Sequence, residues 1–409
     1  MLENVKRFDM FKEPKRQHLR PLIYAITLPN TWSHHTKIKK VKMDNVKPPY
    51  LLLCNHNAFY DFSVASKATF PHRVNYVVAI DGFIKREGLL RAVGGICKRK
   101  FTRDLVLIKH LKTVLERGDI ACIYPEARYS LCGTTAILPE SLGKMIKLFK
   151  VPVVTLICHG NHVNSPFWNL HNNKLKTEAE ITCLFNKDEI EKLDVSEINK
   201  RLNEAFIYDD FKWQRENHIR NKYKKRAEGL HKVLYQCPNC GTEYEMSSKG
   251  TILRCNHCNK EWKLSEYGQL ISKDGIDIFS HIPDWYECER ENVKREILNK
   301  TYYFESEVHI DSLPNAKGYI NVGKGKLIHD LNGFKVIFYD QNNYELIIAA
   351  DEQYGCHIEY EYLGKFGDCV DLNTINDTYY IYPEKEKFSV TKISLACEEL
   401  FKYVSKNKK

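Results

Sequence analysis

The sequence predicts an α/β domain with a mainly parallel sheet and covering helices, followed by a small cysteine-rich module and a β-rich domain with a C-terminal helix. Three observations carry this prediction. Apolar runs alternate with segments of helical periodicity over residues 47–230, as in βαβ units. Two Cys-x2-Cys pairs come next. Over residues 301–409, short alternating runs are separated by Asn, Gly and Asp turns.

The composition describes a folded protein with an anionic partner. At 409 residues the chain is too long for one core, so we expect two or three domains. A net charge of +10 favours a membrane surface or nucleic acid. Residues 1–20 lack the apolar core of an export signal, and the apolar stretch at 21–29 is far shorter than the roughly 20 residues of a spanning helix. Together with 14 cysteines, this predicts a cytoplasmic protein.

Residues 1–46 are basic, with interleaved aromatic residues such as Tyr24 and Trp32 and a lysine-rich run at 37–42. Two interpretations stay open. The segment is a solvated arm that packs its few apolar residues on the next domain, or it is a membrane-interfacial segment. In the second case Lys and Arg would meet anionic headgroups while Trp and Tyr sit at the water boundary. The protein would then bind the inner face of the membrane peripherally.

The elements of the α/β domain, residues 47–230, follow from periodicity. Segments with apolar residues at helical spacing are expected to be helices: residues 105–117 after Asp104 as N-cap, 141–149, and a segment after Asp194 that fits a capping box. Apolar runs between them are expected to be strands: 50–54, 74–80, 119–124 and 151–157. Strand and helix in turn predict a mainly parallel sheet covered by helices. A basic helical segment then leaves this domain near Gly229.

Polar residues follow two of these strands, where ligands bind in open α/β sheets. His56 and Asp61 follow the first strand, and Glu126 and Arg128 follow the strand ending near 124. A neutral histidine suits a base that takes a proton from an attacking hydroxyl, and a carboxylate on its other ring nitrogen fixes the tautomer. The alternative is that His56 caps the helix beginning near Asn57 while Asp61 faces solvent.

Three motifs in order resemble the PlsC-type glycerolipid (lysophospholipid) acyltransferases, with their N-H-x4-D, F-P-E-G-T-R-S and V-P-V-V-P motifs. They lie at residues 55–61, 124–130 and 151–155. The resemblance implies His56 as general base and Asp61 as its orienting carboxylate. It further implies transfer of a fatty acyl group from acyl-CoA or acyl carrier protein to the hydroxyl of a lysophospholipid such as lysophosphatidic acid. Glu126 and an arginine near it would help to bind this acceptor.

The chain departs from the family pattern at the acceptor motif. Where the family has Gly-Thr-Arg-Ser, this chain has Ala127-Arg128-Tyr129-Ser130, so the arginine comes one position early. Arg128 remains a candidate for a bidentate phosphate contact. The family also has an arginine after a glycine-rich turn, for which Arg99 or Lys100 is the candidate; the alternative is a solvated basic turn. Thr155 replaces the final family proline. These shifts permit a glycolipid or another hydroxyl acceptor.

Four cysteines over residues 231–270 predict a zinc ribbon. Fourteen residues separate the pair Cys237 and Cys240 from the pair Cys255 and Cys258, which is close to ribbon spacing. Four protein ligands leave no position for water, so the zinc would be structural. The rival class is a module that binds nucleic acid or protein beside an inactive acyltransferase domain. The charges of the ribbon are nearly balanced, so no nucleic acid is expected.

The other cysteines near the predicted site, Cys54, Cys122 and Cys158, lie in apolar strands and are expected in the core. After the ribbon, residues 271–300 are expected to be a linker with a short helix at 287–298. Residues 301–409 are expected to form the β-rich domain, with strands at 335–339, 344–348, 357–363 and 378–382 and a closing amphipathic helix. This pattern loosely resembles pleckstrin-homology-like modules.

Overall fold

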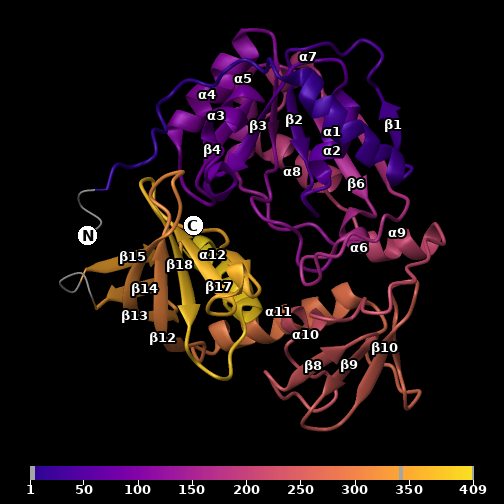
Figure 1. The fold of residues 1–409 in the computed structure, drawn as a ribbon, viewed down its shortest axis with the longest axis vertical. Helices are drawn as coiled ribbons and strands as arrows, with labels where there is room; N and C mark the ends of the chain where they lie inside the picture. The colour runs from indigo at the N-terminus through magenta and orange to yellow at the C-terminus, as the bar shows by residue number, and fades with distance from the viewer. Residues whose placement is uncertain (1–4, 340–343, 408–409) are drawn as a thin grey trace. The chain divides into compact units, whose positions relative to one another are not determined.

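The chain folds into two compact units (Figure 1). The computed structural model describes residues 5–339 and 344–407. The N-terminal unit contains residues 9–98 and 104–222, and the C-terminal unit contains the described residues among 1–8, 99–103 and 223–409. The ends of the expected segments 1–46 and 301–409, together with residues 340–343, lie outside the described part. The boundaries expected at 270 and 300 fall inside the C-terminal unit.

A seven-stranded sheet forms the centre of the N-terminal unit, in the order β1-β7-β6-β2-β5-β3-β4. The five strands from β6 to β4 are parallel, as predicted, while β7 pairs antiparallel with β6 and parallel with β1. The strands are β1 (Lys37–Val41), β2 (Leu51–Cys54), β3 (Val74–Ala79), β4 (Gly95–Lys98), β5 (Ile120–Ile123), β6 (Val153–His159) and β7 (Glu178–Phe185). Strands β2 and β5 are fully buried, which explains their continuous apolar sequence.

Helices cover both faces of this sheet. One face packs on α4 (Leu105–Glu116), α5 (Ser141–Phe149) and α8 (Val195–Ala205), and the other packs on α2 (Asp61–Thr69). The side chain of Asp104 caps α4, and the predicted bounds of α5 are those observed. The remaining helices of the unit are α1 (Arg20–Ser33), the 3-10 turn η2 (Ile80–Phe83), α3 (Glu87–Ala92), α6 (Asn161–Asn164), α7 (Lys187–Lys192) and α9 (Asp210–Glu216).

The helix caps after β7 differ from the expectation in one respect. Asp194 caps α8 by accepting the N–H of Glu197, as predicted. The reciprocal capping box, however, belongs to α7, where the side chains of Asn186 and Glu189 each accept the backbone N–H of the other. Each cap satisfies N–H groups that a helix start otherwise leaves unpaired.

Within the expected N-terminal arm, residues 20–33 form α1 and residues 37–41 form β1 at one edge of the sheet. Helix α1 packs on α2 and buries Ile23, Thr27 and Thr31. Its opposite face is exposed and uncharged. Among the described residues, none of the helices has the combination of length and apolar character that a bilayer crossing requires.

The C-terminal unit contains two antiparallel sheets and two long helices. The smaller sheet has the order β11-β10-β9-β8, and the larger one has the order β15-β14-β13-β12-β18-β17-β16, so that its first and last strands pair at the centre. The smaller sheet follows α10 (Leu230–Val233) and consists of β8 (Met246–Lys249), β9 (Ile252–Cys255), β10 (Glu261–Leu264) and β11 (Leu270–Ser272).

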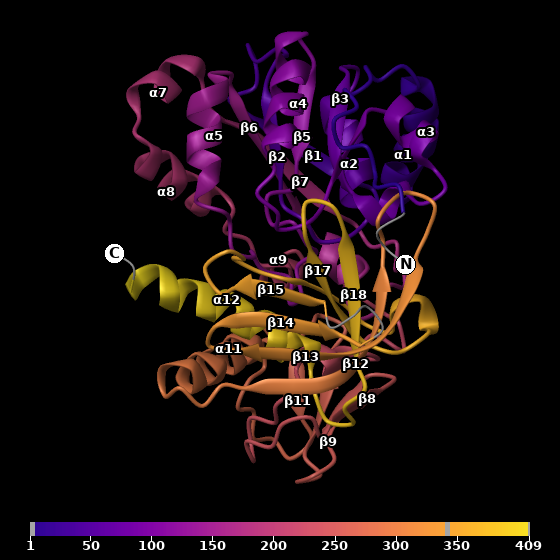
Figure 2. The same cartoon turned by 90° about the vertical axis from the view of Figure 1, so that its left-hand side faces the viewer.

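Helix α11 (Ile282–Leu298) and the C-terminal helix α12 (Val390–Asn407) pack on each other (Figure 2). Helix α11 begins earlier than the expected 287–298. The larger sheet, with the short 3-10 turn η3, consists of β12 (Phe304–Ser312), β13 (Ile320–Asp330), β14 (Gly333–Phe338), β15 (Glu345–Ala349), β16 (His357–Glu359), η3 (Tyr362–Gly364), β17 (Cys369–Asn373) and β18 (Thr378–Pro383). A β-rich unit with a final helix is therefore confirmed.

Candidate active site and four-cysteine site

His56 and Asp61 form a hydrogen-bonded pair at the carboxyl end of β2. The Nδ1 atom of His56 lies 3.1 Å from Oδ2 of Asp61, the first residue of α2. The same oxygen accepts the backbone N–H groups of Asn57 at 2.6 Å and Ala58 at 3.0 Å. The Asp61 side chain is fully buried, whereas 22% of the His56 side chain is exposed. Asp61 therefore faces the imidazole and not solvent, and a substrate can reach the ring.

Glu126, which follows the adjacent strand β5, accepts a hydrogen bond from the loop that contains His56. Its Oε1 accepts the backbone N–H of His56 at 3.2 Å, and its Oε2 accepts the N–H of Ala136 at 3.0 Å and the hydroxyl of Tyr208 at 3.4 Å. Burial raises the pKa of Glu126 to about 8, although the two N–H donors and Arg128 act in the opposite direction. Only 1% of Glu126 is exposed.

Aromatic rings enclose the imidazole. The ring centroids of Tyr124 and Tyr129 lie 4.2 Å and 4.3 Å from that of His56, and Phe167 lies 6.0 Å from Tyr129. Arg128 is buried at 5% exposure. The imidazole is thus surrounded by apolar aromatic rings, two of which carry a polar hydroxyl group. Such surroundings suit a substrate with a hydrocarbon part.

A residue that follows β6, the other strand beside β2, also contacts Asp61, and the sequence did not predict this contact. Asn161, just beyond the end of β6, donates from Nδ2 to Oδ1 of Asp61 at 2.6 Å. The next residue, His162, donates its backbone N–H to Asp210 at 2.8 Å. The available signal was a set of polar residues after an apolar strand, the same signal that identified His56 and Glu126.

The structure places Arg99 and Lys100 in the C-terminal unit, and His56, Asp61, Glu126 and Arg128 in the N-terminal unit. Arg99 is 1% exposed, and its guanidinium donates to the carbonyls of Leu313 and Pro314 and to the hydroxyl of Thr378. The Nζ atom of Lys100 lies 3.3 Å from Asp371. These contacts differ from those of the solvated basic turn that was the alternative.

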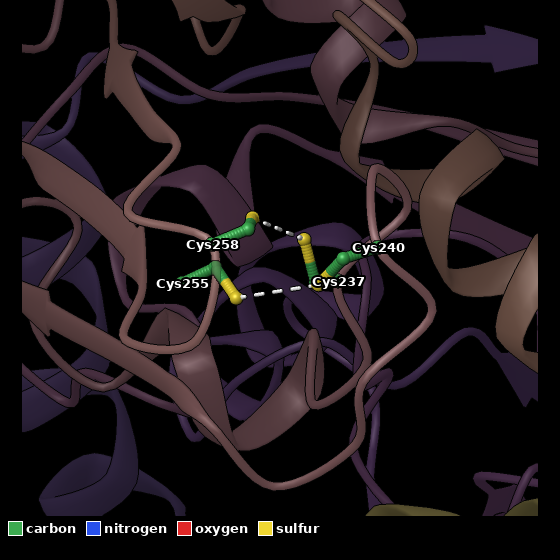
Figure 3. A group of neighbouring side chains, drawn as sticks. All are labelled: Cys237, Cys240, Cys255 and Cys258. Atoms are coloured by element: carbon green, nitrogen blue, oxygen red, sulfur yellow. Dashed lines mark hydrogen bonds between the residues drawn. The ribbon is translucent and has the colours of Figure 1, made fainter.

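The four cysteines of the predicted ribbon converge (Figure 3). All four Sγ atoms lie within 4.8 Å of one another. The pair Cys237 and Cys258 is 3.7 Å apart, and the pair Cys240 and Cys255 is 3.8 Å apart. Four thiolates at about 2.3 Å from a tetrahedral zinc would be about 3.8 Å from one another. The donor set and its spacing fit a metal ion of this kind.

Burial raises the pKa of the Cys237 and Cys255 thiols, and backbone hydrogen bonds act in the opposite direction. Backbone N–H groups of Asn239 and Cys240 donate to Cys237, and those of His257 and Cys258 donate to Cys255. Such donors stabilise negative charge on sulfur. His257 lies in the second turn but is exposed and is not among the converging ligands.

The first ribbon turn is joined to both long helices of its unit. The indole N–H of Trp285 in α11 donates to the carbonyl of Gln236 at 2.8 Å. Lys392 in α12 forms ion pairs with Glu243 and with Glu296 of α11, each at 2.8 Å. We therefore expect a change in the cysteine site to affect α11 and α12 as well as the ribbon.

The N-terminal unit thus combines a mainly parallel α/β sheet with a buried carboxylate that bonds to a partly exposed histidine at the carboxyl end of β2. In a comparison with known proteins, the model of the acyltransferase family, described as Acyltransferase, matches residues 36–159. The matched part of the chain is an acyltransferase domain, and the chain carries a four-cysteine site and a β-rich part after it. The match covers less than a third of the chain.

Two further comparisons complete this description. The crystal structure of the 1-acyl-sn-glycerophosphate (LPA) acyltransferase PlsC from Thermotoga maritima is similar to this chain, with a TM-score of 0.37 and 13% sequence identity. The similarity covers 46% of this chain and 76% of that chain. No curated protein matches the sequence.

Proposed function

We propose that this protein transfers a fatty acyl group from a thioester, acyl-CoA or acyl carrier protein, to the hydroxyl of a lysophospholipid such as lysophosphatidic acid. The observation that carries the proposal is the contact of 3.1 Å between Nδ1 of His56 and the buried carboxylate of Asp61. A carboxylate can only accept, so Nδ1 holds the proton and Nε2 carries the free lone pair. His56 then has the tautomer of a general base.

The reaction follows from this tautomer. Nε2 of His56 takes the proton of the acceptor hydroxyl as its oxygen attacks the thioester carbonyl. Asp61 stabilises the imidazolium that forms. The C–O bond forms, the C–S bond breaks, and the leaving thiolate takes the proton back from His56. No covalent enzyme intermediate is involved, and Cys54, Cys122 and Cys158 are all fully buried.

Two substitutions test the assignment. His56→Ala removes the base without removing core volume, and we expect loss of acyl transfer with an unchanged unfolding temperature. Asp61→Asn favours the wrong tautomer, and a loss of about 10⁴ in kcat is the reference for such a change. Single-turnover assays with a long-chain acyl-CoA and lysophosphatidic acid measure both. A near-normal rate for His56→Ala would remove the general-base assignment.

The acceptor has a second candidate, a glycolipid or another neutral hydroxyl lipid. Tyr129 lies against His56 where the resemblance would place a phosphate-binding arginine, and Arg128 is buried. Both observations favour an acceptor without a phosphate at this point. Glu126 and Arg128 remain candidates for acceptor contacts, whereas we leave Arg99 and Lys100 out because their side chains bond within the C-terminal unit.

A panel of acceptors decides between the two candidates. Purified protein is incubated with each donor and with lysophosphatidic acid, a neutral monoacylglycerol or a glycolipid, and the products are identified by mass. Arg128→Gln is tested in parallel. If Arg128 binds phosphate, this substitution raises KM for lysophosphatidic acid and leaves KM for the neutral acceptors unchanged.

We further propose that Cys237, Cys240, Cys255 and Cys258 hold a structural zinc ion. The convergence of the four sulfur atoms and their spacing support this assignment. A closed four-thiolate set has no position for substrate or water, so the ion would contribute folding free energy and not chemistry.

The exposed face of α1 supports binding to an anionic membrane surface at the inner face of the membrane. Leu22, Ile26 and Trp32 are 43%, 64% and 62% exposed, and no charged residue lies between Arg20 and the end of the helix. Phe59, in the loop that follows His56, is 80% exposed. The adjacent strand β1 presents lysines to solvent. Apolar burial and attraction to anionic lipids would then act together near the site. We expect no nucleic acid partner.

A further inference from the structure

The Asp61 carboxylate uses both of its oxygens. Oδ2 accepts His56 Nδ1 and two backbone N–H groups, while Oδ1 accepts the side-chain amide of Asn161 at 2.6 Å. We propose that Asn161 is a positioning residue that holds the Asp61 carboxylate turned toward His56. This inference rests on the proposed role of His56 as general base. Asn161, which follows β6, thereby supports a pair whose members lie just after β2 and at the start of α2.

The amide of Asn161 is oriented by the carboxylate. Its Nδ2 donates to Asp61, while among the described residues its buried Oδ1 has no hydrogen-bond partner. A buried acceptor without a partner destabilises a fold. If the amide were turned round, its oxygen would face the carboxylate instead, and two acceptors would meet. The contact with Asp61 therefore fixes the orientation of the amide, although this orientation leaves its oxygen without a hydrogen bond.

The backbone around Asn161 is held from two sides. Gly160 has a φ of +83°, and a Cβ there would lie 2.5 Å from the ring of Trp213, so only glycine fits. After Asn161, the N–H of His162 donates to the buried carboxyl of Asp210, whose own N–H donates to the carbonyl of Gly133 at 2.9 Å. This segment cannot move away from Asp61 without breaking these contacts.

Other ionisable groups face Asp61, and the test must separate their effects from that of Asn161. Those in and beside β2 and α2 are Cys54 and Tyr60; those from β5 and the segment after it are Tyr124 and Glu126; those from β6, from the segment before α9 and from its first residue are Cys158, Tyr208 and Asp210. None of them is altered when Asn161 is replaced. A change in the tautomer of His56 in such a variant therefore reports on the Asn161 contact.

Removal of the amide donor has a defined geometric consequence. Oδ1 of Asp61 would lose the contact that fixes the plane of the carboxylate, so Oδ2 would hold the Nδ1–H tautomer of His56 less firmly. A hydrogen bond to a charged group corresponds to a factor of about 10 to 100 in rate. We expect this loss in kcat, with KM nearly unchanged, because Asn161 acts through Asp61.

The experiment compares Asn161→Leu with Asn164→Leu in the full-length protein. Asn164 lies in the same short helix α6 and is equally buried, but its Oδ1 accepts the N–H of Leu175. Single-turnover rates with a long-chain acyl-CoA and the preferred acceptor of the panel are measured at several pH values. ¹⁵N NMR of the imidazoles, with His56 assigned by its absence in His56→Gln, gives the tautomer without any substrate.

The expected result is a slower reaction and a smaller population of the Nδ1–H tautomer of His56 in Asn161→Leu, with neither change in Asn164→Leu. An unchanged tautomer and rate in a folded Asn161→Leu variant would overturn the inference. If that variant does not fold, Asn161→Ala, which is smaller and also lacks the donor, is measured in the same way, and an unchanged tautomer and rate there would overturn the inference equally. An active His56→Ala variant would instead refute the proposed function, so the two failures are distinguishable.

Discussion

The backbone N–H of His56 donates to Oε1 of Glu126 at 3.2 Å, so one buried carboxyl group joins the loop after β2 to the loop after β5. Tyr208 completes the link, because its hydroxyl lies within hydrogen-bond distance of both Asn57, at 3.0 Å, and Glu126, at 3.4 Å. The position of the imidazole thus depends on Glu126, for which the family resemblance implied a role in acceptor binding.

The first prediction concerns this link. Glu126→Ala leaves the N–H groups of His56 and Ala136 without their acceptor, and each unpaired buried donor costs about 1–3 kcal/mol. We expect a lower unfolding temperature together with a fall in kcat. Glu126→Gln keeps one acceptor and should be milder in both respects. Calorimetry and single-turnover rates test this, and a normal kcat in Glu126→Ala would show that the link does not position His56.

The second prediction is the pH dependence of stability. Burial raises the pKa of Glu126 from 4.5 and that of Asp210 from 3.8, each to about 8. In the window between these values the folded state binds more protons than the unfolded state, so stability falls as pH rises toward 8. Each group contributes a slope of at most ~1.4 kcal/mol per pH unit.

Urea unfolding at several pH values between about 5 and 8 measures this slope. Glu126→Gln and Asp210→Asn should each make it shallower, because each removes one of the titrating groups. A slope that is unchanged in both variants would contradict the assignment of raised pKa values to these two carboxyls.

The third prediction concerns the metal. Purified protein should contain about one zinc ion per chain, and Cys240→Ser should lower this content. Since Gln236 and Glu243 bond to α11 and α12, loss of the metal should destabilise the C-terminal unit and not only the ribbon. Hydrogen exchange resolves the two units. Ordered ribbon amides in a metal-free preparation would refute the site, and Cys288→Ser, outside the cluster, serves as the control.

The fourth prediction concerns the membrane. Flotation with anionic vesicles should show binding that falls substantially, but not wholly, as salt rises, because salt screens charge and not apolar burial. Ile26→Ser and Trp32→Ser should weaken it. Deletion of residues 1–40 is not a clean test, since it removes most of β1 from the sheet.

Leu148→Ser is the matched control, because Leu148 is 55% exposed on α5, which covers the opposite face of the sheet. Equal binding by Ile26→Ser, Leu148→Ser and the unaltered protein would contradict an interfacial role of α1. So would binding that ignores both lipid charge and salt.

The acyltransferase sheet could be predicted because its signals are local. Asp104 caps α4 as expected, and the apolar spacing of residues 141–149 gives α5 its observed bounds. The pair His56 and Asp61 was found because a spacing of five residues at a strand end keeps both side chains together, as the 3.1 Å contact shows. The four cysteines converge for the same reason within each turn.

What could not be predicted depends on distant contacts. Helix α1 was not predicted because it contains prolines at 21 and 29 and has no polar face that would give a helical periodicity. Strand β1 was not predicted because it is a lysine-rich, half-exposed edge strand without a clear alternation. Asn161 meets Asp61 only because β6 lies beside β2 in the sheet. The fate of Arg99 depended on the carbonyl groups of Leu313 and Pro314, more than 200 positions away.

Residues 99–103 also affect the order in which the chain can mature. Arg99 and Phe101, the latter 8% exposed and packed on Tyr354, are buried parts of a unit whose other residues are almost all synthesised more than a hundred positions later. Until those later residues are synthesised, the side chains of Arg99 and Phe101, in the loop between β4 and α4, lack the partners that bury them. A fragment that ends at residue 222 would never contain these partners, and a fragment that starts at residue 223 would lack Arg99 and Phe101. Neither fragment would then contain the contacts that Arg99 and Phe101 make with Leu313, Pro314, Thr378 and Tyr354.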